Sequence, residues 1–277
     1  MNYQEEAKQA RIKVLDLIFR AQTSHIGSNF SCIDILTVLF DKIDLTKDKF
    51  ILSKGWAAAS LYYFLWKKGR ITEEELNSYC GKCPACQGNS FKDKEWRYKN
   101  LDTVTREICS DCQGTGVSKF IGLAEPVIPD ISFAGGSMGF GLSAAVGYAL
   151  SKKLKGEEGK VYCLMSDGEL NCGTTWESAL IASHHKLDNL IVIVDNNGFQ
   201  AMGKTDDILR VSYLPIIGYV INGHNYKEIE SALENGGLIY AKTTKGKGVS
   251  FMENDNIWHY KAPNQDEYEL ALKELNG

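Results

Sequence analysis

Apolar and polar residues along this chain form blocks whose spacing changes between the period of a helix and that of a strand. Residues 5–20 repeat apolar side chains three and four positions apart, which predicts an amphipathic helix, and short apolar runs such as 161–165 predict strands. The expected elements are helices at 5–20, 32–40 (with Ser31 as N-cap), 57–67, 142–154 and 174–184, strands at 50–53, 161–165 and 190–194, and further alternating elements at 219–221, 226–233 and 238–242. This order predicts an α/β fold with a mainly parallel sheet flanked by helices.

The alternation stops between residues 80 and 119, where apolar periodicity fades and most of the eight cysteines gather. With 277 residues and 44% apolar composition, the chain can bury a large core. We therefore interpret residues 1–277 as a single domain that carries an inserted cysteine-rich module at 80–119.

The net charge of the chain and its lack of long apolar runs limit the kinds of partner that it can bind. A net charge of −4 and an isoelectric point near 5.8 argue against nucleic acid or an anionic membrane. No apolar run approaches the ~20 residues of a membrane span, and the acidic, polar start of the chain is unlike a signal peptide. We expect a cytoplasmic protein whose cysteines bind metal or stay reduced.

Two C-x-x-C-x-G motifs lie in the inserted module, at Cys83/Cys86 and Cys109/Cys112. Each turn directs two thiolates at one ion, and four thiolates suit a closed, structural, tetrahedral Zn²⁺ site. Unligated reduced thiols are the alternative, an iron–sulfur cluster is less favoured, and Cys80 is a fifth candidate that could replace one ligand. The remaining cysteines lie in or beside expected core elements and are predicted to be buried thiols: Cys32, Cys163 and Cys172.

Polar motifs follow two of the predicted strands. Ser166-Asp167-Gly168-Glu169 comes after 161–165, and Asp195-Asn196-Asn197 comes after 190–194. Each motif alone is common in turns, but carboxyl ends of parallel strands meet where open α/β folds bind ligands. Asp167 and Asn197 offer hard oxygen ligands for Mg²⁺, and Gly168 would let a diphosphate approach backbone amides. The pair therefore predicts a thiamine diphosphate site.

The residues around these motifs resemble those of transketolases over nearly the whole chain outside the cysteine module. The matching stretches are Thr23-Ser-His-Ile-Gly27, Leu52-Ser-Lys-Gly55, Gly136-Ser-Met-Gly139, Ser166-Asp-Gly-Glu-Leu-Asn171, Trp176-Glu-Ser-Ala179, His184-His-Lys-Leu-Asp-Asn-Leu190, Asp195-Asn-Asn-Gly-Phe-Gln-Ala-Met-Gly-Lys-Thr205, Lys245-Gly-Lys-Gly-Val-Ser-Phe-Met-Glu-Asn254 and Trp258-His259.

The resemblance implies a thiamine diphosphate-binding fold and a role for each matching residue. Mg²⁺ would be held by Asp167, Asn197 and the backbone carbonyl of Phe199. Gly168 would offer its amide to the diphosphate, and the positions beside the aminopyrimidine ring are Gly136 and Met138. The matching active-site histidines, which contact substrate or diphosphate and assist proton transfer, are His25 and His259.

The chain matches only the diphosphate-binding part of a transketolase, so it resembles the N-terminal subunit of a split enzyme. The resemblance implies a C-terminal partner subunit with the pyrimidine-binding half, a dimer of heterodimers, and transfer of a two-carbon ketol unit from a ketose or ketose phosphate to an aldehyde. Two alternatives remain: a related carboligase with the same cofactor, and a non-catalytic regulatory or partner-binding subunit.

Four departures from the family pattern stand out. Trp56 stands where a histidine usually follows Leu-Ser-Lys-Gly, and the segment 122–126 has no clear match to a further family histidine. Cys172 replaces a glutamate of the network between paired active sites, and Ser166 replaces a glycine. Two explanations of these replacements are open. The chain is an inactive homologue in which the residues have drifted, or its pocket is altered to accept a bulky or nucleotide-linked sugar.

Overall fold

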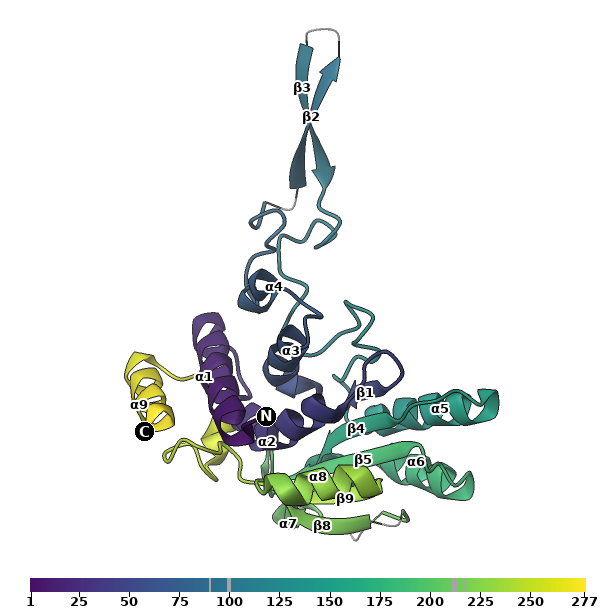
Figure 1. Cartoon of the computed structure of the whole chain (residues 1–277). Coiled ribbons are helices and arrows are strands. Elements are labelled where there is room, and N and C mark those ends of the chain that lie inside the picture. The colour runs from purple at the N-terminus through teal and green to yellow at the C-terminus, as the bar shows by residue number, and fades with distance from the viewer. Residues whose placement is uncertain (90, 99–100, 211–213, 217) are drawn as a thin grey trace.

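The computed structural model describes residues 1–89, 91–98, 101–210, 214–216 and 218–277, with the backbone alone for 91–98 and 101–107 (Figure 1). Its α-helices are α1 (Tyr3–Ala21), α2 (Ile26–Lys42), α3 (Ala58–Lys67), α4 (Glu73–Asn77), α5 (Phe140–Lys155), α6 (Gly173–His184), α7 (Thr205–Ile208), α8 (Tyr226–Asn235) and α9 (Gln265–Asn276). Its strands are β1 (Lys49–Leu52), β2 (Phe91–Tyr98), β3 (Leu101–Ile108), β4 (Val161–Ser166), β5 (Leu190–Asn196), β6 (Phe199–Gln200), β7 (Gly203–Lys204), β8 (Gly218–Asn222) and β9 (Gly237–Lys242). Short 3₁₀ turns are η1 (Gly55–Ala57), η2 (Asp167–Asn171) and η3 (Asn256–His259).

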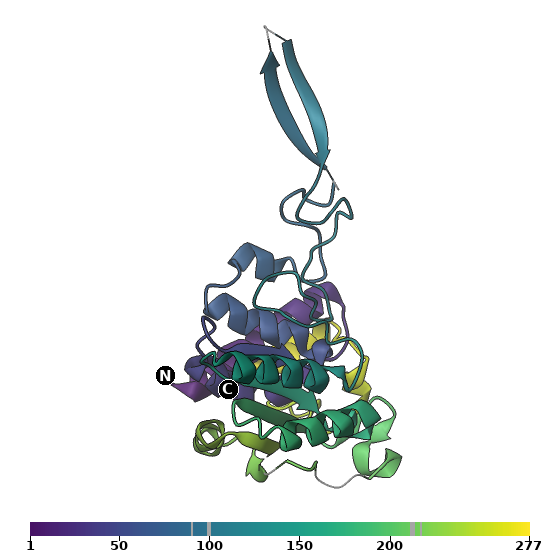
Figure 2. The same cartoon turned by 90° about the vertical axis from the view of Figure 1, so that its right-hand side faces the viewer.

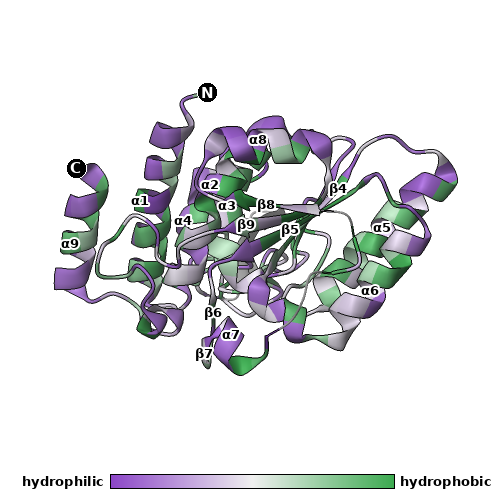
Figure 3. Ribbon diagram, turned by 90° about the horizontal axis from the view of Figure 1, so that it is seen from below, coloured by the Kyte–Doolittle hydropathy of each residue, from purple (hydrophilic) through white to green (hydrophobic). Residues whose placement is uncertain are grey.

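Five strands form one sheet in the order β1-β4-β5-β9-β8, and every neighbouring pair is parallel. Successive side chains of a strand point to opposite faces, so this sheet has a core on each side. Tyr162 and Leu164 pack with α1, α2, α3 and α8, whereas Cys163 and Met165 pack with α5 and α6. Figure 3 shows the sheet between these helices. The predicted mainly parallel sheet flanked by helices is confirmed.

The start of α2 corrects the sequence prediction. The helix begins at Ile26, and His25 before it has a left-handed backbone with φ of 73°. Ser31 is therefore inside the helix rather than its N-cap, and its hydroxyl donates to Asp195 Oδ2 at 2.6 Å and lies 3.1 Å from the backbone oxygen of Ser28. Helix α2 is buried through almost its entire length, so apolar periodicity could not mark its beginning.

The cysteine-rich insert leaves the body beside α4 and returns before the glycine-rich stretch 135–141. Its two ends pair with each other: the Cys80 N–H donates to the Phe120 oxygen at 2.8 Å, and the Ser118 N–H donates to the Gly81 oxygen at 2.9 Å. Beyond this pairing, β2 and β3 form an antiparallel hairpin that extends away from the sheet (Figures 1 and 2). The sequence predicts a metal-bound module or a loop in this segment and does not predict the hairpin.

No helix in the described part of the chain is long and apolar enough to cross a membrane.

Two glycines of α5 provide a matched test of how closely this helix packs on the loop after β1. A Cβ on Gly141 would lie 2.2 Å from Ser53 Oγ, whereas a Cβ on Gly147 meets nothing within 4 Å. We expect Gly141→Ala to lower the free energy of unfolding by about 2 kcal/mol, because the helix must move away from its neighbour. Gly147→Ala should leave it unchanged or raise it by up to about 1 kcal/mol, since alanine favours helix. Chemical unfolding of both variants measures this, and equal losses would contradict it.

Candidate active site

The two polar motifs meet at the carboxyl ends of β4 and β5. Ser166 and Asp195 are partners in the strand register, and the loops that follow are joined by a hydrogen bond from the Gly198 amide to Asp167 Oδ2 at 2.8 Å. Asp167 also accepts from the Gly168 amide at 2.9 Å and the Thr205 hydroxyl at 2.9 Å. One carboxylate thus organises both loops.

Asn197 is held so that its side-chain oxygen stays available. Its Nδ2 donates to Ser31 Oγ at 3.3 Å, while Oδ1 accepts from the Phe199 amide at 3.0 Å. An amide oxygen has two lone pairs, so Oδ1 can accept a further partner.

A cavity of about 310 Å³ opens above these loops and brings together residues from distant parts of the sequence. Its lining contains every predicted site residue outside the cysteine module except Asp167, namely His25, Gly136, Met138, Gly168, Asn197, Phe199 and His259. Asp167 is not part of that lining and is only 2% exposed. Burial, with the nearby charge of Asp195, raises the pKa of Asp167 to about 6, although hydrogen bonds from Thr205 and the two amides oppose the shift.

Glu169 explains why the glycine-rich stretch lies against the end of β4. Its buried carboxylate accepts from the Ser166 amide at 2.8 Å, the Gly139 amide at 3.1 Å and the Ser53 hydroxyl. These contacts join β4, the loop after β1 and the first turn of α5. Gly136 and Met138, which precede that turn, are thereby directed to the cavity.

A buried ion pair underlies the cavity floor. Lys54 and Asp195 are both fully buried and bonded to each other, and Lys54 Nζ also donates to the Ser28 oxygen at 2.9 Å. Burial opposes the charge on Lys54, but Asp195 outweighs it and raises the pKa of the lysine.

Lys245 is a second buried cation, and it has no carboxylate within ion-pair distance among the described residues. Its Nζ contacts His259 Nδ1 at 3.0 Å and Asn256 Oδ1 at 3.3 Å. Burial, with the charge of Lys54, lowers the pKa of Lys245 to about 8. An unpaired buried cation beside a cavity favours an anionic ligand.

The two histidines face each other across one wall of the cavity. Their ring centroids are 5.0 Å apart, and the His25 amide donates to the His259 oxygen at 3.0 Å. Burial is the main cause that lowers the pKa of His25 to about 4 and that of His259 to about 3, and Lys245 and Lys54 add to it. Both imidazoles are therefore neutral near pH 7.

Trp56 and Tyr260 both line the cavity, with ring centroids 6.3 Å and 5.9 Å from that of His25. The departure from the family pattern thus adds aromatic surface to the cavity itself. Cys172 lies at the start of α6, packed near Gly139, and is half-buried. The prediction of a buried thiol is wrong for Cys172, while it is confirmed for Cys32 and Cys163.

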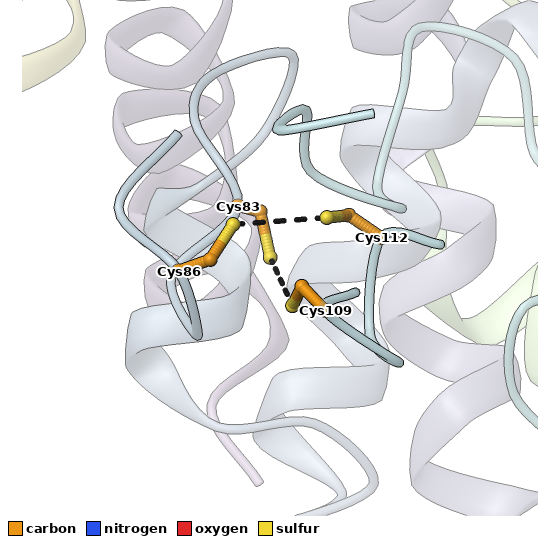
Figure 4. A group of neighbouring side chains, drawn as sticks. All are labelled: Cys83, Cys86, Cys109 and Cys112. Carbon is orange, nitrogen blue, oxygen red and sulfur yellow. Dashed lines mark hydrogen bonds between the residues drawn. The ribbon is translucent and has the colours of Figure 1, made fainter. Parts of the chain in front are cut away.

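The four cysteines of the C-x-x-C motifs converge in one cluster (Figure 4). The Cys83 and Cys109 sulfurs are 3.9 Å apart, those of Cys86 and Cys112 are 3.7 Å apart, and all four lie within 4.8 Å of one another. A tetrahedral ion with Zn–S bonds of about 2.3 Å places its sulfurs about 3.8 Å apart. Cys80 is not part of the cluster.

Both halves of the cluster have the same backbone. Gln87-Gly88 after Cys86 and Gln113-Gly114 after Cys112 have left-handed φ values of 52° and 85°, and of 51° and 82°. The Gly116 amide also donates to the Cys112 sulfur at 3.3 Å. The two motifs thus bring their sulfurs together from turns of the same kind.

Comparison with known proteins agrees with this site. Residues 117–275 match the family described as transketolase, thiamine diphosphate binding domain. The chain is 33% identical to a subunit of the apulose-4-phosphate transketolase of Actinobacillus succinogenes, over 98% of this chain and 95% of that protein. The chain belongs to the transketolase family.

Other members of the transketolase family define which part of the enzyme the chain represents. It is 29% identical to the 6-deoxy-6-sulfo-D-fructose transketolase subunit SqwG of a Clostridium species, over 99% of this chain and 96% of that protein. The solved Campylobacter jejuni transketolase superimposes with a TM-score of 0.80 and 27% identity, over 100% of this chain but 43% of that one. The predicted relation to the N-terminal, thiamine diphosphate-binding subunit of a split transketolase is confirmed.

Sequence reasoning missed the roles of Lys54, Lys245 and Glu169. All three lie within motifs that carry the resemblance, but lysine and glutamate are usually exposed. A charged residue directly after the predicted strand 50–53 was the available signal for Lys54, and Glu169 closes the polar motif that follows 161–165. Nothing local to Lys245 marks it as buried.

The neutral histidines predict how stability changes with pH. Because folding lowers both pKa values, the unfolded chain binds protons more readily below about pH 6.5. We therefore expect this contribution to stability to be complete above pH 6.5 and to be lost progressively as the pH falls towards 4. A chain with His25→Asn and His259→Gln should lose less stability between pH 7.5 and pH 5 than the wild type, measured by chemical unfolding. An equal loss in both chains would refute the assignment.

Proposed function

We propose that this chain is the cofactor-binding subunit of a two-chain transketolase, which transfers a two-carbon ketol unit from a ketose phosphate to an aldehyde acceptor. The observation that carries the proposal is the joining of both strand-end motifs by Asp167, beneath a cavity that His25 and His259 line. The placement of metal-ligand and proton-transfer groups at one end of a parallel sheet suits a diphosphate cofactor.

The residues present fit thiamine diphosphate with Mg²⁺. Asp167, Asn197 and the Phe199 carbonyl are hard oxygen donors of the kind Mg²⁺ prefers, and the buried carboxylate of Asp167 has no ion-pair partner among the described residues. The amide of Gly168, which donates to Asp167 Oδ1 in this structure, would exchange that bond for one to the diphosphate, and a Cβ at Gly168 would come within 3.3 Å of Met138 Cε. Gly136 and Met138 would flank the aminopyrimidine ring. When bound, the cofactor supplies the carbon nucleophile for carbon–carbon cleavage.

Proton handling would belong to the two neutral histidines. Since His259 Nδ1 is bonded to Lys245, its Nε2 is the nitrogen left to face substrate. The positive charge of Lys245 also favours an anionic group in the cavity. His25 and His259 would thus bind substrate oxygens and exchange protons with them.

The aromatic wall favours an unusual acceptor. Trp56 cannot exchange protons near neutral pH, but its indole adds a flat apolar surface beside His25. The two relatives named for apulose-4-phosphate and 6-deoxy-6-sulfo-D-fructose support substrates outside the common sugar phosphates. We propose a bulky or nucleotide-linked sugar as the acceptor class.

A partner subunit would complete the site. The chain spans 43% of the Campylobacter transketolase, and large apolar side chains are exposed around the cavity mouth, with Met202 at 74% and Tyr260 at 67%. Such exposure favours burial against another chain. The proposed assembly is a dimer of heterodimers in the cytoplasm, with the pyrimidine-binding half on the partner.

Zinc is the proposed occupant of the cysteine cluster, in a structural role. Four thiolates leave no coordination position open to substrate. The site would close the module at 80–119 by joining the two turns, which are separated by the hairpin.

Ketose-phosphate cleavage by this chain with its C-terminal partner, Mg²⁺ and thiamine diphosphate tests the function. We expect Asp167→Ala to lower the rate more than about a hundredfold, because even indirect metal contacts are typically worth 10–100-fold. Asp207→Ala, which removes an exposed carboxylate, is the matched control and should leave the rate unchanged. An acceptor screen should favour bulky sugars, and Trp56→His should shift the preference towards simple aldose phosphates.

Other outcomes of this experiment would decide between the alternatives. Cofactor binding without cleavage of any ketose donor would favour a regulatory subunit or another carboligase. Tryptophan in place of the family histidine at position 56 would then reflect relaxed selection rather than a change of substrate. Preference for simple aldose phosphates by the unchanged chain would overturn the acceptor proposal alone.

Zinc binding is tested by metal analysis of the purified chain. We expect about one zinc per chain, and Cys112→Ser should reduce the bound zinc and make residues 80–120 more accessible to hydrogen exchange. The half-buried Cys172 provides the control, since Cys172→Ser should retain the metal. Wild-type chain that neither contains zinc nor binds it in titration would refute the site.

A further inference from the structure

The turn after β9 is held by side chains that lie outside the cavity. Residues 243–247 follow the last buried strand and include Lys245, whose Nζ contacts His259 in the cavity wall. On the sheet side, the Thr243 hydroxyl donates to Asp195, and the Thr243 amide donates to the Asn196 oxygen at 3.1 Å. These contacts fix the start of the turn but not the direction of Lys245.

His224 fixes the next residue of the turn. Its Nε2 accepts a hydrogen bond from the Thr244 amide at 2.8 Å, and its Nδ1 lies 2.7 Å from Asp34 Oδ2. A nitrogen that accepts from a backbone N–H carries no proton, so Nδ1 bears the proton and donates to Asp34. The imidazole therefore connects α2 to the turn in a single tautomer.

Asp34 is itself rigidly held. Arg11 binds it with two nitrogens, at 3.1 and 2.7 Å, and the Tyr226 hydroxyl donates to it at 2.9 Å. The carboxylate is only 3% exposed, and Arg11 Nε also donates to the Lys247 oxygen at 2.9 Å. The network thus bonds to the turn on both sides of Lys245.

The space given to Lys245 is narrow. A Cβ on Gly27 would lie 3.0 Å from Lys245 Cγ and 3.2 Å from Cε, and the Gly246 amide donates to the Gly27 oxygen at 2.9 Å. The Lys245 side chain therefore has little room to adjust, and a small movement of the turn would displace its Nζ from His259.

We infer that Asp34 and His224 are positioning residues, which act through the Thr244 amide to keep Lys245 Nζ against His259 at the cavity. The effect of this positioning on ligand binding rests on the proposed function, in which Lys245 and His259 contact the bound anion and the substrate. The positioning of Lys245 by His224 is a property of the free chain and can be tested without measuring catalysis.

Three variants separate positioning from general stability. His224→Phe keeps a ring of similar size but removes both hydrogen bonds, whereas His224→Gln retains one donor and one acceptor. Tyr226→Phe is the matched control, because it removes one bond to Asp34 and leaves Thr244 untouched. We expect His224→Phe and Tyr226→Phe each to reduce stability, with His224→Gln closer to the wild type.

The first readout is the imidazole ¹⁵N spectrum of the free chain, in which five histidines are present. The Nδ1 resonance of His259 should move in His224→Phe, as its bond from Lys245 is lost, and should stay in place in Tyr226→Phe and His224→Gln. The second is thiamine diphosphate affinity with Mg²⁺ and the partner subunit, which should fall about tenfold in His224→Phe alone, the effect of roughly one lost charge-assisted hydrogen bond.

An unchanged His259 resonance in His224→Phe, or an equal movement in Tyr226→Phe, would overturn the inference. If the wild-type complex fails to bind thiamine diphosphate, the proposed function is wrong, and the His259 resonance still decides whether His224 positions Lys245.

Discussion

The buried ion pair between Lys54 and Asp195 determines how the rest of the site can be built. Asp195 lies in the central strand β5, Lys54 lies in the loop after β1, and hydroxyls of Ser31 and Thr243 complete the contacts of the carboxylate. Removing one member would leave an uncompensated buried charge, typically at a cost of about 3–5 kcal/mol. The pair thus fixes α2 and two strand-end loops in one arrangement and leaves little freedom for the cavity floor.

Charge is distributed unevenly above that floor. Lys54 is neutralised by Asp195, whereas among the described residues Lys245 is bonded to a neutral imidazole and an amide and lies over the ring of Phe199. The carboxylate of Asp167 is stabilised by amides and a hydroxyl rather than by a cation. Lys245 and Asp167 thus have no ion-pair partner among the described residues, which suits a ligand that brings both a metal ion and phosphate oxygens.

The sequence predicted the functional residues whose positions depend on local patterns, namely the ends of strands and short turns. Asp167 and Asn197 come together because parallel strands place their carboxyl ends at one edge, and the four cysteines converge because each turn is encoded locally. The contact between His224 and Asp34 spans 190 residues and leaves no local pattern. Ser31 was misplaced as a cap because a buried helix lacks amphipathic periodicity, and the β2–β3 hairpin was missed because its charged segment has no apolar alternation.

The paired ends of the cysteine module have a consequence for how the chain can change over evolution. Since Cys80 and Phe120 are bonded to each other, the main body continues across this point almost as if the intervening residues were a long surface loop. Changes in the length of such a loop alter its closure entropy only slowly, and they leave the strand ends where they are. A change in the length of the outer module would therefore leave the register of the sheet beneath it unchanged.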